Sequence, residues 1–201
     1  SVWIAQREGR TKDGNDATHQ GVLKMLTLAD ENQDIVSYFK KIKIVPISIS
    51  YEYDPTDILK MPELLAKSRD EKYVKSENED FVNLLRGIMG TKKRIHIQVN
   101  GVLEKEVNQI ASEDLNQNEK LGRLTELVDE KIWQGYKLWP SNFIAYDLLH
   151  KEDKFKQHYT PEEKASFEKR LQDKIDTSNP VIVENFLSMY AYPVINQLKL
   201  S

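Results

Sequence analysis

Three short apolar runs have the pattern of β-strands. The first covers residues 2–5, the second residues 43–51 and the third residues 94–99. The second run is almost wholly apolar through Ile49, which is typical of a strand buried on both faces of a helix-covered parallel sheet. In the third run, isoleucine and valine alternate with polar residues, as they do in a strand whose two faces differ.

Most of the remaining chain repeats apolar residues at helical spacing. Helix starts are predicted at Asp54-Pro55, at the capping box that opens with Thr160-Pro161, and at Asn179-Pro180. Ser141 is predicted to cap a further helix. The periodic segments are residues 16–29, 35–42, 77–89, 121–132 and 143–149.

The order of these elements predicts an α/β fold, in which a partial, mostly parallel sheet is covered by helices and followed by a mainly helical C-terminal portion. We expect one domain over residues 1–201, with the sheet in 1–103 and the helical part in 104–201. Because three strands are few for such a sheet, we expect the chain to be the C-terminal part of a larger domain. Its open edge would pair with the N-terminal part of the same parent protein, or with a second copy.

Composition and charge exclude several classes of function. The formal net charge of −3 does not favour a nucleic-acid binder, and the absence of cysteine excludes disulfides and thiolate metal sites. No apolar run approaches the roughly 18 residues of a membrane span, so we expect a cytoplasmic protein. Lys92-Lys93-Arg94 could meet anionic headgroups in a peripheral membrane contact, although a run of three is more often a solvated turn. No histidine pair has metal-ligand spacing, so no metal site is predicted.

A turn rich in basic residues follows the first apolar run. Arg7, Arg10 and Lys12 lie among small residues, and Gly9 and Gly14 permit close backbone approach. Guanidinium and ammonium groups suit phosphate oxygens, so the turn is a candidate phosphate site. A solvated, charged loop is the alternative interpretation.

Two blocks of sequence resemble glycerolphosphate and lysophospholipid acyltransferases. The first is Arg7-Glu8-Gly9-Arg10-Thr11-Lys12-Asp13-Gly14, which is similar to the family's Glu-Gly-Thr-Arg-Ser-Lys-Asp-Gly type of block. The second is Val45-Pro46-Ile47-Ser48-Ile49-Ser50-Tyr51-Glu52, similar to a later strand with an internal proline. Its Tyr-Glu ending is closest to the glycerol-3-phosphate acyltransferase branch. The blocks have the family's order and approximate distance, and cover about the first quarter of the chain.

The resemblance implies transfer of a fatty acyl group from acyl-CoA or acyl-carrier protein to glycerol 3-phosphate or a lysophospholipid. Arg10, helped by Lys12 and Arg7, would hold the acceptor phosphate, and Pro46 would shape a wall of the site. The remaining substrate-binding residues that it implies are Glu8, Gly9 and Thr11. Glu8 lies one position later than the family's glutamate, whereas the arginine and lysine positions match.

The family's catalytic signature, His-x-x-x-x-Asp, is not in this chain. None of the four histidines has an aspartate at that spacing, so the sequence predicts no catalytic residue and an inactive fragment. In the family, the histidine would deprotonate the acceptor hydroxyl and the aspartate would orient it. The alternative is a non-catalytic module, a pseudo-enzyme that binds a phosphorylated ligand or another protein.

Overall fold

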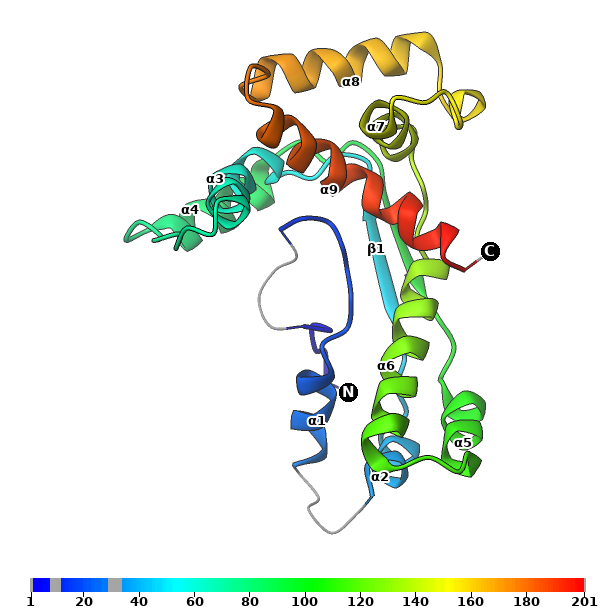
Figure 1. Cartoon of the computed structure of the whole chain (residues 1–201). Helices are drawn as coiled ribbons and strands as arrows, with labels where there is room; N and C mark the ends of the chain where they lie inside the picture. The colour runs from blue at the N-terminus through cyan, green and yellow to red at the C-terminus, as the bar shows by residue number, and fades with distance from the viewer. Residues whose placement is uncertain (1, 8–11, 29–33, 201) are drawn as a thin grey trace.

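The fold is taken from a computed structural model of the chain, which describes residues 2–7, 12–28 and 34–200. Within these ranges the chain forms nine α-helices, one 3₁₀-helix and two strands (Figure 1). In chain order they are α1 Gln20–Thr27, α2 Ile35–Ile42, β1 Ile47–Tyr51, α3 Asp57–Ser68, α4 Glu79–Met89, β2 Ile95–Val99, α5 Glu104–Ser112, α6 Gln117–Gln134, α7 Pro140–His150, η1 Lys156–His158, α8 Pro161–Lys174 and α9 Pro180–Leu198.

The predicted α/β class is wrong, because the structure is mostly helical (59 %) and its sheet is a two-stranded antiparallel ladder. Ile49 of β1 lies opposite Ile97 of β2 in this ladder. The predicted strand at residues 2–5 is neither strand nor helix, and its side chains are exposed. Among the described residues, strand pairing is found only between β1 and β2, so the backbone groups of residues 2–5 have no strand partner of the kind that a sheet requires.

Strand β1 buries its polar face rather than its apolar one. The Ser48 hydroxyl donates to the carbonyl of Ile132, 2.7 Å away, and the Ser50 hydroxyl accepts from the backbone N–H of Lys137 at 3.1 Å. Gly135 passes so close that a Cβ there would lie 2.5 Å from the Ser48 Oγ. The prediction of a strand buried on both faces is therefore wrong. The end of α6 leaves room only for small side chains, and Ile49 points to the exposed side.

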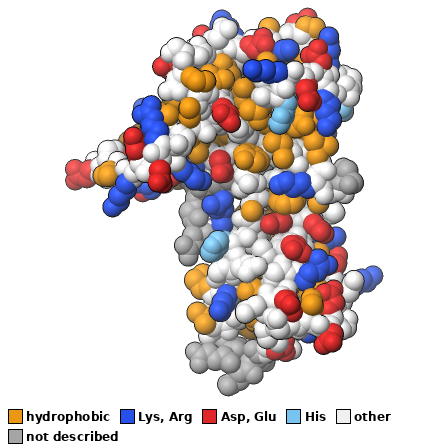
Figure 2. All heavy atoms as spheres, in the orientation of Figure 1, with side chains coloured by type: hydrophobic (Ala, Val, Ile, Leu, Met, Phe, Trp, Pro, Cys, Tyr) orange, Lys and Arg blue, Asp and Glu red, His pale blue; other side chains and the backbone are white. Residues whose placement is uncertain are grey.

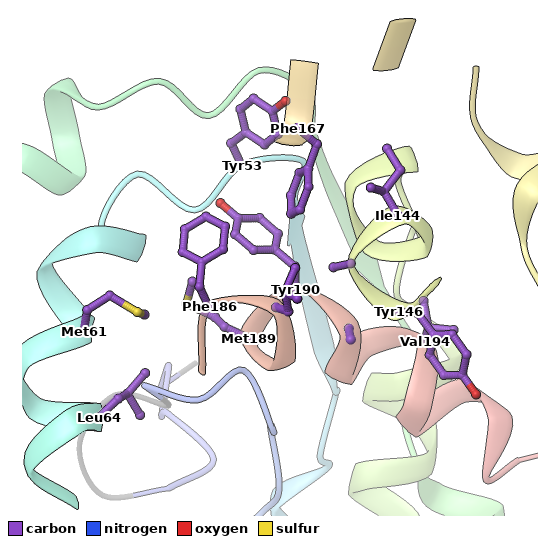
Figure 3. Close-up of a cluster of buried hydrophobic side chains, with 13 residues drawn as sticks. Tyr53, Met61, Leu64, Ile144, Tyr146, Phe167, Phe186, Met189, Tyr190 and Val194 are labelled. Carbon is purple, nitrogen blue, oxygen red and sulfur yellow. The ribbon is translucent and has the colours of Figure 1, made fainter. Parts of the chain in front are cut away.

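The helices form two hydrophobic cores, one toward each end of β1 (Figure 1). One joins α3, α7, α8 and α9, and Figure 3 shows the rings of Tyr53, Phe186 and Tyr190 grouped in it beside Phe167. The other joins α1, α2, α5 and α6. Each core takes residues from both 1–103 and 104–201, so sheet-bearing and helical parts are interleaved in space.

Local helix signals are largely confirmed. The capping box at Thr160 forms, because its hydroxyl accepts from Glu163 N–H at 3.2 Å while the Glu163 carboxylate accepts from Thr160 N–H at 2.9 Å. Asn179 caps α9. Ser141 does not cap α7, since the helix begins one residue earlier and the serine hydroxyl donates to the Glu52 carbonyl at 2.6 Å. Helix α3 begins after Thr56, later than the Asp54-Pro55 signal predicted.

Candidate ligand-binding groove

A groove of about 750 Å³ lies between the N-terminal segment and β1. Its walls include residues 2–7 on one side and residues 44–51 on the other, and residues of α4, α6 and α9 complete them. Both blocks that carry the resemblance therefore contribute to one concavity, through Arg7 and Gly14 of the first and residues 45–51 of the second. The volume falls within the range of small-molecule sites, which is about 300–1,000 Å³.

The groove combines apolar walls with basic side chains. Its apolar residues include several that are exposed, namely Val2, Trp3, Ile4, Val45, Ile49 and Ile88. Its charged lining comprises four basic and two acidic side chains, which are Arg7, Lys60, Lys92, Lys137, Asp16 and Asp54. An apolar trough with an excess of positive charge suits a ligand that has both a hydrocarbon chain and an anionic group.

The N-terminal wall is fixed by close contact with α9 and α6. Gly14 has φ of +78°, and a Cβ there would lie 2.2 Å from the carbonyl oxygen of Met189. Beyond it, the Asp16 carbonyl accepts from the Trp133 indole at 2.8 Å, and the Asp16 carboxylate accepts from the Tyr136 hydroxyl at 2.8 Å. Burial and the nearby Asp16 charge raise the pKa of Tyr136, so its hydroxyl stays protonated and acts as a donor.

A second anchor of this wall is a buried carboxylate on α6. Asp129 accepts hydrogen bonds from the backbone N–H of Thr18 at 2.7 Å and from its hydroxyl at 2.5 Å. Desolvation raises the pKa of Asp129 despite these two donors. The segment after Gly14 is thus bonded to α6 at two points, at Trp133 and at Asp129, and these bonds hold the end of the first block in place.

Part of the groove wall is a polar cluster, including Asp54, Lys60 and Tyr190, whose groups bond to one another. The Tyr190 hydroxyl donates to Asp57 at 2.7 Å and accepts from the backbone N–H of Asp54 at 3.1 Å. Arg170 of α8 also donates to Asp57, at 2.6 Å, and Lys60 pairs with Asp54. Desolvation by burial raises the pKa of Tyr190. These groups join α3, α8 and α9, so the cluster supports that wall of the groove.

The predicted site residues are only partly brought together. Arg7 lines the groove, and Pro46 is a buried part of its wall whose carbonyl accepts from Asn100 N–H at 3.0 Å. In the register continued past the end of β1, Pro46 lies opposite Asn100, and because proline has no N–H it cannot return a hydrogen bond to the Asn100 carbonyl. Lys12 is not in the lining, and its Nζ lies 2.7 Å from the Glu63 carboxylate of α3. Glu8, Gly9, Arg10 and Thr11 lie outside the described residues.

Sequence reasoning missed the basic residues that distant elements bring to the groove. Lys60 comes from α3 and Lys137 from the connection between α6 and α7. No motif marks either lysine, because α3 and the α6–α7 connection reach the groove only through tertiary packing. Across the described ranges, no cluster of three or more histidine, aspartate or glutamate side chains is placed to hold a metal. Nor does any helix in those ranges have the length and apolar character needed to cross a bilayer.

Comparisons with protein-family models, with curated proteins and with solved structures find no match to this chain.

Proposed function

We propose that the groove binds a phosphorylated glycerol that carries an acyl chain, as the acceptor-binding part of a glycerolphosphate-type O-acyltransferase. The observation that carries the proposal is that the two sequence blocks resembling that family, far apart in the chain, line the same groove. The groove's apolar walls and basic lining fit the two halves of such a ligand.

Each half of the ligand has a place in the groove. Arg7 offers a planar guanidinium to phosphate oxygens, and its charge is supplemented by that of Lys137. Ile49 and Ile88 give the acyl chain apolar contact. In the transfer reaction, the acceptor hydroxyl attacks the thioester carbonyl, a base takes its proton and the thiol leaves. The family's base is absent from these 201 residues, so the proposal for this chain concerns binding.

Calorimetric titration of the 201-residue chain tests the proposal. The probes are lysophosphatidic acid below its micelle concentration, monoacylglycerol, which lacks the phosphate, and glycerol 3-phosphate, which lacks the chain. Lysophosphatidic acid should bind tightest, because only it meets both the apolar wall and the basic side chains. Equal affinity for lysophosphatidic acid and monoacylglycerol would remove the phosphate from the proposal.

Two matched pairs of variants locate the binding. Ile49→Asp should weaken lysophosphatidic acid binding, whereas Ile97→Asp should not, because Ile97 is its ladder partner on the same exposed face but lies outside the groove. Arg7→Ala should lower affinity for lysophosphatidic acid about tenfold or more through loss of a charge-assisted contact. Lys12→Ala serves as its control, since Lys12 pairs with Glu63. Equal losses within either pair would place the ligand elsewhere.

A non-catalytic module is the second candidate, because the apolar and basic lining of the groove would serve ligand binding without catalysis equally well. Both candidates predict the same ligand binding. They differ in whether the chain acts in acyl transfer at all. Mixing the chain with radiolabelled acyl-CoA and glycerol 3-phosphate should yield no product in either case. Product formation by the purified chain would instead show that it holds a base outside the known signature.

A further inference from the structure

Helix α4 has the reverse of the usual polarity of a surface helix, because its polar face contacts the protein and its apolar face is exposed. Its half-buried positions are polar or small, at Glu79, Asn83 and Gly87, which share one helix face. Glu79 accepts from the Tyr73 hydroxyl at 2.8 Å, and a Cβ on Gly87 would meet Thr56 at 3.4 Å. This face is therefore the one turned toward the rest of the molecule.

Every apolar side chain of α4 is exposed. Phe81 and Ile88 are each 67 % exposed and Met89 is 78 % exposed, and no residue of the helix is buried. The others are Val82, Leu84 and Leu85. Figure 1 and Figure 2 show α3 and α4 projecting from the body of the molecule, in keeping with the exposure of these side chains. A contiguous apolar helix face that is left in water marks an interaction surface.

The charges around this face are one-sided. From Phe81 to Arg94 the sequence has four basic residues and no acidic one, in a chain whose net charge is −3. Lys93 and Arg94 lie 3.6 and 2.8 Å from the Glu52 carboxylate, and Arg94 lies 3.9 Å from that of Glu163, so four positive charges meet two negative ones and the region stays net positive. The acidic residues at the start of α4 are engaged locally, since Asp80 pairs with Lys75 at 2.8 Å and Glu79 bonds to Tyr73. Exposed Phe, Leu and Ile beside Arg and Lys are the composition of a helix that lies in the interface of an anionic membrane.

We propose that α4 docks on an anionic lipid surface, with Phe81, Val82, Leu85 and Met89 in the headgroup region and Arg86 against lipid phosphates. None of these five residues lines the groove. Eleven residues are too few to span a bilayer, which needs about 20, so the helix lies along the surface. The charge complementarity favours lipid over a protein partner. This docking goes beyond ligand binding in the groove and does not depend on it.

Vesicle flotation of the full chain tests the docking. The probes are vesicles of phosphatidylcholine alone and of phosphatidylcholine with phosphatidylglycerol in equal parts. The double variant Phe81→Asp, Met89→Asp should lose about tenfold or more of its binding to the anionic vesicles, because both apolar contacts become like-charged with the lipid. Neither residue lines the groove, so lysophosphatidic acid binding should persist. Ile97→Asp, Val99→Asp is the control, since it removes equally exposed apolar residues from β2.

The basic contribution has its own readout. Arg86→Glu should weaken binding to the anionic vesicles, and added salt should reduce the difference from the unmodified chain. Unchanged flotation of the α4 double variant, or equal loss in the β2 control, would overturn the proposal. So would concentration-dependent self-association that the α4 variant abolishes without any vesicle binding by the unmodified chain, because the face would then bind a second copy.

Discussion

A substitution at Gly14 tests most directly whether the end of the first sequence block packs against α9. Its φ of +78° is a conformation that costs an L-residue about 1–2 kcal/mol. An alanine Cβ would also lie 2.2 Å from the Met189 carbonyl oxygen and 2.9 Å from its carbonyl carbon, well inside van der Waals contact. Forcing apart packed groups typically costs about 1–3 kcal/mol. The two effects together predict that Gly14→Ala lowers the free energy of unfolding by about 2–5 kcal/mol.

Urea denaturation followed by circular dichroism measures this loss, and a thermal melt should show a drop of about 4–20 °C. The matched control is Gly101→Ala, because a Cβ at Gly101 meets nothing within 4 Å and its φ is not positive. That variant should change the free energy of unfolding by about 1 kcal/mol or less. If Gly14→Ala proves as stable as Gly101→Ala, the segment does not lie against α9, and the groove wall built on it is misplaced.

The remaining predictions concern the buried cluster, a titrating carboxylate and the phosphate site. Tyr190→Phe removes the donor to Asp57 and should cost about 1–3 kcal/mol in urea unfolding; no loss would mean that water replaces it. Because the pKa of Asp129 is raised in the folded protein, protonated Asp129 stabilises the fold, and this stabilisation is fully present below the ordinary pKa of 3.8. It is lost as the pH rises through the higher pKa of the folded state. Asp129→Asn should abolish this pH dependence, and parallel pH–stability curves would contradict the assignment. Arg10→Ala, predicted from the resemblance alone, should weaken lysophosphatidic acid binding at least tenfold in calorimetry while sparing the melting temperature; the reverse would make Arg10 structural.

Helices were predictable where their signals are local. The capping box at Thr160 depends on contacts three residues apart, and the apolar spacing of residues 35–42 is complete within α2. Such signals can be recognised from the sequence, because the interacting groups are neighbours along one helix. The resemblance predicted Arg7 and Pro46 as substrate-binding residues; both line the groove, and their role in binding stays a prediction.

Strand pairing and the direction of burial were decided by the tertiary structure. The sequence by itself determined that Ile49 and Ser48 point to opposite faces of β1, since that follows from the two-residue period of any strand. It could not determine which face is covered, because that depends on α6, whose Gly135 admits the Ser48 hydroxyl and excludes a larger group. The same is true of the groove, whose basic residues come from elements that meet only after the chain has folded.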